Sequence, residues 1–425
     1  MKTRGRERIL NVVLACASFF IFLGGAEIFC RLVRPDERWF RDPYAKENPL
    51  FRLLRYDPVL GWTGRPGAKV LYLDERLNGR GLRGPDFPDE KAPGSVRIVA
   101  LGDSCTWNVQ FSDVTRRPIP LIELADPFPA LLGAMLAPLA TPDRRYEVVN
   151  GGVLGYSTLQ GLRFFRRDVI RWNPDVILVR YVWNDHWAAD PAYRIRSEPR
   201  SAALRWIRWQ MLRSRFYAFL VRLITTAMGQ TLSAHPAEKP VPTGGAPPVK
   251  ALRVPPEEFA FGLRLMVREA RAGGVIPILA TAPAGVVTEK LRRSGAYAPM
   301  LRSLGYGSAE EIFRVHDRYN DLVRRVAREE SAPLIDLDAA FAARGRGRFF
   351  GPTEILHPNT RGNALIAELA LEELRRLQVV PVALPAAEET RRSPQRNARP
   401  ARGAGDRRRH ARSPDRSALS DGRPR

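Results

Sequence analysis

Cysteine is scarce in this chain, which excludes a fold that depends on disulfides. The 425 residues include 3 cysteines, and two of these, Cys16 and Cys30, lie in an apolar segment near the N-terminus. Cys105 is left without a second cysteine in the rest of the sequence. We therefore expect Cys105 to be a packing residue and the chain to be stabilised by its own buried core, which a domain of this size can form.

Histidine is also scarce, and the common cofactor-binding motifs are missing. The chain has no His-Glu-x-x-His, no Cys-x-x-Cys and no Gly-x-x-x-x-Gly-Lys sequence, so we expect neither a cofactor nor a metal. His186 is interpreted as a solvent-facing loop residue and His316 as part of a polar helix. His235 and His410 lie in segments of low expected order, which leaves His357 for the motif described below.

Negative charge is in short supply. The chain has 45 Asp and Glu against 68 Lys and Arg, which gives a formal net charge of +23. Much of the excess lies in residues 381–425, an arginine-rich tail that has almost no large apolar side chains beyond residue 391. Because such a segment cannot bury a core, we expect it to be disordered. Its charge predicts binding to polyanions such as an acidic glycan or lipid headgroup, and no specific nucleic acid partner.

One long hydrophobic run occurs, at residues 9–33, and it follows a basic stretch at residues 1–8. About 20 apolar residues span a bilayer, and flanking positive charge stays in the cytoplasm. The run therefore predicts a single-pass membrane anchor with the rest of the chain on the extracytoplasmic side. The alternative is a signal peptide cleaved after residues 24–26, Gly-Gly-Ala, which would give a secreted protein. We favour the anchor because apolar character continues through residues 28–33.

The remaining sequence alternates short apolar segments with longer segments of helical periodicity. From residue 96 to residue 380 this alternation predicts an α/β fold, in which a parallel sheet of about five strands is covered by helices on both faces. The expected strands are residues 97–101, 146–150, 176–181, 276–281 and 333–336. The expected helices are residues 128–136, 160–171, 256–272, 317–330 and 360–377.

Two segments depart from this alternation. Residues 34–95 are rich in Pro, Gly and aromatic residues, and we expect a small appendage with short β-strands, packed on the main domain. Residues 186–254 look inserted. Within them, residues 202–228 have a basic amphipathic helix pattern, which is typical of a helix that lies in a membrane interface, covers an active site, or only packs on the domain. Residues 234–248 predict a Pro- and Gly-rich loop.

Polar residues that can carry chemistry follow the expected strands. Ser104 comes directly after the first strand, Asn184 follows the third, and His357 precedes the last helix. The carboxyl ends of parallel strands meet at one edge of a sheet, where ligands bind in α/β folds. The sequence therefore predicts a serine-hydrolase site at this edge.

These residues resemble the SGNH hydrolase superfamily, also called GDSL-type esterases, in its membrane-anchored bacterial form. Residues 102–104, Gly-Asp-Ser, match the first of its four sequence blocks. Residues 149–156, 181–185 and 354–359 match the other three in the usual order. The resemblance covers roughly residues 95–378 and implies a three-layer α/β/α, flavodoxin-like fold.

The resemblance also implies a role for each site residue. Ser104 would be the nucleophile, His357 the general base and then acid, and Glu354 the acid that orients His357. The oxyanion would be held by the backbone amides of Ser104 and Gly155 and by the side chain of Asn184.

The sequence departs from the family pattern at two positions. The usual aspartate is replaced by Glu354, so Asp338 is kept as an alternative acid. The third block usually has glycine two residues before its asparagine, and here that position is Val182, whose side chain could narrow the pocket.

These observations favour a membrane-anchored extracytoplasmic esterase that removes an acyl group such as acetyl from an envelope glycan or lipid. An O-acyltransferase with the same site and a non-catalytic cell-envelope binding protein are the alternatives.

Overall fold

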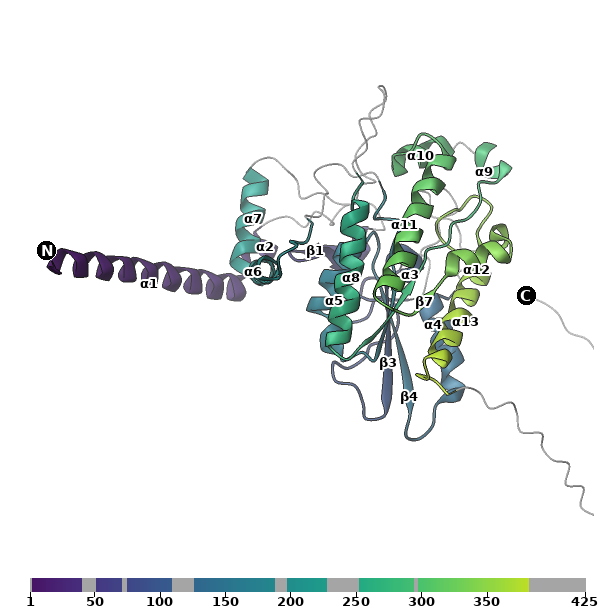
Figure 1. Cartoon of the computed structure of the whole chain (residues 1–425), viewed down its shortest axis with the longest axis horizontal. Helices are drawn as coiled ribbons and strands as arrows, with labels where there is room; N and C mark the ends of the chain where they lie inside the picture. The colour runs from purple at the N-terminus through teal and green to yellow at the C-terminus, as the bar shows by residue number, and fades with distance from the viewer. Residues whose placement is uncertain are drawn as a thin grey trace, which may run out of the picture. The chain divides into compact units, whose positions relative to one another are not determined.

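The computed structural model describes residues 2–39, 51–70, 75–108, 126–187, 197–227, 252–293 and 297–381 (Figure 1). Contacts divide the chain into Met1–Pro381 and Val382–Arg425. The predicted tail, beyond Pro381, and the predicted loop at residues 234–248 lie outside the described residues.

A five-stranded parallel sheet forms the centre of the fold, with the strand order β4-β3-β5-β6-β7. Numbered along the chain within this sheet, the order is 2-1-3-4-5, which is flavodoxin-like and confirms the predicted fold class. Its strands are β3 (Ser95–Gly102), β4 (Arg145–Gly152), β5 (Val176–Arg180), β6 (Ile276–Ala280) and β7 (Leu334–Ile335). The strand order reverses at β3 and β5, and ligands bind at such a switch point in open α/β sheets.

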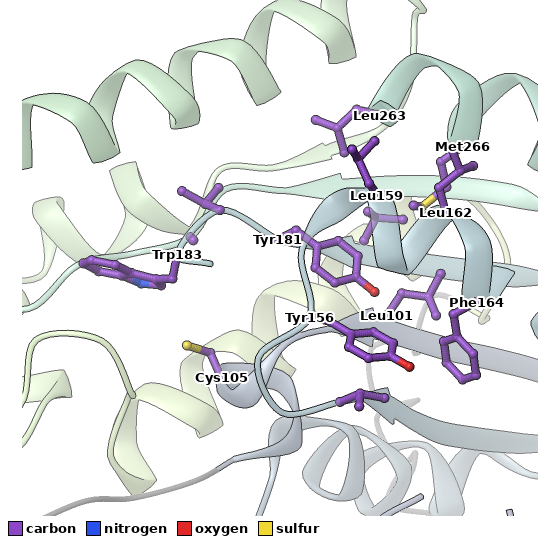
Figure 2. Packing of buried hydrophobic residues seen from close by; sticks show 14 of the residues in the cluster. Leu101, Cys105, Tyr156, Leu159, Leu162, Phe164, Tyr181, Trp183, Leu263 and Met266 are labelled. Carbon is purple, nitrogen blue, oxygen red and sulfur yellow. The ribbon is translucent and has the colours of Figure 1, made fainter. Parts of the chain in front are cut away.

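Helices cover both faces of the sheet, because alternate side chains of each buried strand point to opposite faces. On β3, Val99 and Leu101 belong to one buried cluster, and Ile98 and Ala100 belong to the other. The first face is covered by α5 (Thr158–Arg167), α8 (Pro256–Ala272) and α11 (Ala309–Glu329). The second is covered by α4 (Phe128–Leu136), α12 (Leu337–Ala343) and α13 (Thr360–Arg376). Figure 2 shows part of the first cluster, around Leu101.

Three helices differ from the periodicity-based prediction. Helix α5 ends at Arg167 and is followed by a 3-10 turn, Val169–Trp172. Helix α11 begins at Ala309 because Ser308 caps it by accepting a hydrogen bond from the Glu311 amide. The expected helix at residues 202–228 is two helices, α6 (Ala202–Arg213) and α7 (Arg215–Ala227), because the backbone between them is extended at residue 214.

The N-terminal part contributes a long helix and a hairpin. The helix is α1 (Lys2–Val33), and the short α2 (Pro35–Arg38) follows it. Strands β1 (Leu54–Asp57) and β2 (Gly61–Gly64) pair antiparallel, and Trp62 of β2 is buried in the same cluster as Leu101 of the central sheet. The remaining helices are α3 (Ser104–Trp107), α9 (Glu289–Arg293) and α10 (Tyr297–Leu304), with 3-10 turns at Phe51–Leu53, Ala137–Leu139 and Arg346–Phe349.

Candidate active site

Ser104 lies at a sharp turn from strand β3 into helix α3. Asp103 caps this helix by accepting a hydrogen bond from the Cys105 amide at 2.9 Å. The turn requires glycine at position 102, because a Cβ atom there would lie 2.0 Å from Thr106 Oγ1 and 2.8 Å from the Arg180 carbonyl oxygen. Because β3 ends at Gly102 and α3 begins at Ser104, Ser104 lies at the carboxyl edge of the sheet.

Ser104, His357 and Glu354 form a continuous chain of hydrogen bonds, although Ser104 and His357 are far apart in the sequence. Ser104 Oγ lies 3.0 Å from His357 Nε2, and His357 Nδ1 lies 3.1 Å from Glu354 Oε2. His357 and Glu354 belong to the loop that enters α13, which begins after the capping residue Asn359. This arrangement is the one that lets a histidine take a proton from a serine hydroxyl.

The Glu354 carboxylate is held on both oxygens. Oε2 faces His357, and Oε1 accepts hydrogen bonds from the amides of Ile355 at 2.9 Å and Leu356 at 2.8 Å. Burial alone would raise the pKa of Glu354, but His357 and the backbone hydrogen bonds outweigh it and lower the pKa below its usual value. Glu354 is therefore an anion at neutral pH.

Asp338, the alternative acid, has different partners. Its oxygens accept hydrogen bonds from Arg324, at 3.0 Å, and from Arg346. The side chain is buried and forms an ion pair with each arginine. The contact of His357 Nδ1 with a carboxylate is made by Glu354.

Asn184 and Gly155 follow the two strands that flank β3, Asn184 after β5 and Gly155 after β4. Asn184 donates a hydrogen bond from Nδ2 to Asp103 Oδ2 at 3.1 Å, so Asp103 links the turn after β3 to the loop after β5. Gly155 lies in a turn closed by a hydrogen bond from the Tyr156 amide to the Val153 carbonyl, and its φ of 75° is favoured in glycine. The Val153 amide in turn donates to the carbonyl of Gly102, which joins the turns after β3 and β4.

The family model for the GDSL-like lipase/acylhydrolase family matches residues 100–365, well over half of the chain. The chain belongs to this family. It is therefore an ester-bond hydrolase of the GDSL type, as the four sequence blocks predicted. A comparison with curated proteins finds no match.

Solved structures similar to this GDSL-type hydrolase include two bacterial enzymes. One is a lipase/acylhydrolase from Enterococcus faecalis, with 15% identity, a TM-score of 0.38, and coverage of 66% of this chain and 96% of that one. The other is Axe2, an acetylxylan esterase from Geobacillus stearothermophilus, with 17% identity, a TM-score of 0.36, and coverage of 67% and 96%.

The prediction that His186 faces solvent is wrong. His186 of the GDSL-type hydrolase is 1% exposed, with Nδ1 lying 2.8 Å from Tyr306 Oη and Nε2 lying 3.0 Å from His316 Nδ1. His316 is fully buried and stacks on Trp183, with ring centroids 4.0 Å apart. Burial lowers the pKa of His316 to about 4, so this histidine is neutral at physiological pH. Tyr306 and His316 cover His186, and no short motif reveals such a contact.

Cys105, beside Ser104, has the surroundings of a packing residue. It is buried, and its Sγ lies 3.4 Å from the Leu356 carbonyl oxygen. Burial raises the pKa of Cys105 well above its usual value, so the reactive thiolate is disfavoured. This agrees with its interpretation as a packing residue.

Sequence reasoning missed three residues near the site. Trp62 donates from Nε1 to the Leu154 carbonyl at 2.8 Å, and Arg253 donates from Nη1 to the Gly155 carbonyl at 2.7 Å. Arg180, at the end of β5, is buried, and its Nε and Nη2 atoms have no hydrogen-bond partner among the residues that the structure describes. These residues lie in no recognisable motif, so a single sequence carries no signal for them. Among the residues that the structure describes, no group of three or more His, Cys, Asp or Glu side chains could hold a metal ion.

Proposed function

We propose that this chain is a membrane-anchored serine esterase in which Ser104 is the nucleophile. The observation that supports this most strongly is the hydrogen-bond chain from Ser104 Oγ through His357 to Glu354. His357 Nε2 takes the hydroxyl proton as Oγ attacks the acyl carbonyl carbon, and then returns this proton to the alcohol that leaves. A water molecule, deprotonated by the same nitrogen, then attacks the acyl group. The acyl group leaves as a carboxylic acid, and His357 passes the proton to Ser104 Oγ.

Three donors stabilise the negative charge that develops on the acyl oxygen: the amides of Ser104 and Gly155 and the side chain of Asn184. Asn184 has two N–H groups on Nδ2, and one of them is bonded to Asp103. This bond orients the amide while leaving the second N–H for the oxyanion. Asp103 is therefore a positioning residue for Asn184.

The anchor is α1. Arg6–Val33 is long and apolar enough to cross a membrane, although a signal sequence near the N-terminus has the same features. Retention is supported by Glu27, near the end of α1, which accepts hydrogen bonds from the Arg215 and Phe216 amides at the start of α7. A catalytic domain held on the extracytoplasmic side would meet O-acylated envelope glycans and lipids, and we propose these as the substrate class.

The nucleophile can be tested with full-length protein in detergent, comparing the natural sequence with Ser104→Ala. The assays are labelling by a fluorophosphonate and turnover of short-chain p-nitrophenyl esters. We expect Ser104→Ala to lose both while keeping its thermal unfolding temperature. Equal labelling and turnover in the two proteins would refute the assignment. If the fluorophosphonate labelled Ser104 but ester turnover required an added acceptor sugar, the protein would be an acyltransferase.

A further inference from the structure

The carboxylate of Glu27, in α1, lies at the start of α7. Glu27 Oε1 accepts from the Arg215 amide at 3.1 Å, and Oε2 accepts from the Phe216 amide at 3.0 Å and the Ser214 hydroxyl at 2.7 Å. The first amides of a helix have no partner within it. Glu27 accepts hydrogen bonds from the first two amides of α7, and the Ser214 hydroxyl oxygen accepts one from the Tyr217 amide at 3.0 Å. The end of α1 is thereby tied to the start of α7.

Charged and aromatic contacts extend this packing. Arg215 forms an ion pair with Asp36 of α2 at 2.9 Å, and Asp36 is fully buried. Phe22 and Phe216 lie edge to face with centroids 6.2 Å apart. Helices α1, α2, α6 and α7, which we call the N-terminal platform, therefore form a connected group of contacts, with α6 packed on α7.

Several large apolar side chains of α6 and α7 are exposed. On α6, Leu204, Ile207 and Met211 are 56%, 47% and 44% exposed, and their spacing of three and four residues places them on one face. Leu223 and Ile224 of α7 are also exposed. Apolar surface of this kind marks an interaction site.

The length of α1 places this surface at a membrane boundary. The run from Ile9 to Ala26 has no charged residue, and its 18 residues form a helix of about 27 Å, close to the roughly 30 Å hydrocarbon core of a bilayer. Glu27 is the first charged residue after this run, so it would lie where the hydrocarbon ends. Because Glu27 caps α7, the start of α7 would lie at the same depth.

We propose that α6 and α7 lie on the bilayer that α1 crosses, with Leu204, Ile207 and Met211 inserted among the headgroups and upper acyl chains. Arginines accompany the apolar residues along α6, at positions 205, 208 and 213, and suit the phosphates of anionic lipids. The catalytic domain is then held against the membrane rather than on a free tether. This rests on the proposed role of α1 as an anchor, and not on the esterase chemistry.

A fluorophore that reports polarity can test this surface in the full-length protein, in nanodiscs that contain anionic lipid. The label is attached at Ile207→Cys and, as a matched control, at the exposed Glu289→Cys of α9, both with the exposed Cys16 changed to serine. We expect a blue-shifted emission and strong quenching by brominated lipids at position 207, but not at position 289.

Two results would overturn the proposal. The label at position 207 could be quenched by aqueous iodide as strongly as the label at position 289, which would place α6 in water. It could also be protected from both quenchers, which would mean that protein covers this face. Neither result would affect turnover by Ser104, so a failure of this proposal is separate from a failure of the proposed function.

The hairpin β1–β2 reaches the proposed oxyanion hole through Trp62. Residues 153–156 form a turn with a hydrogen bond from its fourth amide to its first carbonyl and a positive φ at Gly155, as in a type II turn. The central peptide of this turn joins Leu154 to Gly155. Its carbonyl accepts the hydrogen bond from Trp62 Nε1 at 2.8 Å.

We propose that Trp62 is a positioning residue for the Gly155 amide. A trans peptide is planar, with its C=O and N–H pointing in opposite directions. Holding the Leu154 carbonyl toward Trp62 therefore fixes the Gly155 N–H on the side away from the hairpin and prevents the peptide from flipping. The proposal rests on the assigned role of Gly155 as an oxyanion donor.

The test is Trp62→Phe, which keeps an aromatic ring but removes the N–H donor. Loss of a whole oxyanion donor costs about 10²–10³ in kcat, so a loosened one should cost about tenfold, with KM nearly unchanged. The matched control is Tyr156→Phe, which removes the 2.7 Å hydrogen bond from Tyr156 to the Trp62 carbonyl and leaves the Leu154 contact in place. Equal kcat loss in both variants, or a Trp62→Phe effect confined to KM, would overturn the proposal. If the natural sequence had no turnover dependent on Ser104, the proposed function itself would fail.

Discussion

Replacing Glu354 by glutamine should reverse the tautomer of His357. Glu354 Oε1 accepts two backbone hydrogen bonds, from Ile355 and Leu356, and a glutamine must keep its carbonyl oxygen there because its other atom is a donor. The side-chain NH₂ group then faces His357 Nδ1. That nitrogen becomes an acceptor, and the ring proton moves to Nε2, where it blocks proton transfer from Ser104.

The expected loss is large, because the wrong tautomer in a serine triad costs about 10⁴ in kcat, or roughly 5 kcal/mol of barrier. Glu354→Gln should therefore have a kcat about 10³–10⁴ lower than the natural sequence, with KM nearly unchanged. Steady-state hydrolysis of a p-nitrophenyl ester measures both parameters. Glu354→Asp keeps the tautomer and should lose much less.

Asp338→Asn is the matched control. It weakens the ion pairs with Arg324 and Arg346, so the unfolding temperature should fall while kcat stays the same. The opposite result would be a Glu354→Gln variant that keeps more than a tenth of the natural kcat and an Asp338→Asn variant whose kcat falls by more than tenfold. That result would make Asp338 the triad acid and would refute the assignment of Glu354.

Three further predictions concern stability. Arg97 is fully buried and donates to one carboxylate and three backbone carbonyls, so Arg97→Met should lower the free energy of unfolding by about 3 kcal/mol in urea titrations; a loss below 1 kcal/mol would contradict this. Burial raises the pKa of Asp185 to about 8, so the folded state holds a proton that the unfolded state releases near pH 4, and stability falls as the pH rises between these values. Asp185→Asn should reduce the fall in unfolding temperature between pH 5 and pH 8, and an unchanged fall would argue against a neutral Asp185. Gly102→Ala places a Cβ atom 2.0 Å from Thr106 Oγ1 and should abolish soluble protein or lower its unfolding temperature sharply, whereas Gly133→Ala, whose nearest contact is 3.8 Å, should be tolerated.

Much of the site could be predicted from the sequence, because its main residues lie in short motifs at fixed places in an α/β fold. Ser104 directly follows a buried strand, and His357 and Glu354 are three residues apart before a helix. The geometry brings these three residues together. Their chemical roles stay predictions until the variants above are measured.

The rest depends on contacts between residues that no local pattern links. Trp62 and Leu154 are 92 residues apart, and His186 and His316 are 130 apart. A polar residue in a loop is usually exposed, so the sequence alone predicts an exposed His186. Its burial is explained by packing against Tyr306 and against His316 of α11. The break at Ser214 was missed for a similar reason, because both flanking segments favour a helix and the interruption coincides with the contact between Ser214 and Glu27.

Trapping the acyl-enzyme tests directly whether Ser104 is the nucleophile. Full-length protein is mixed with p-nitrophenyl acetate and quenched in acid within one turnover, and the modified peptide is identified by mass spectrometry. We expect one acetyl group on Ser104, which accumulates in Glu354→Gln more slowly than in the natural sequence and is absent in Ser104→Ala. Turnover with no acyl group on Ser104, or an acyl group on another residue, would contradict the assignment of Ser104 as the nucleophile.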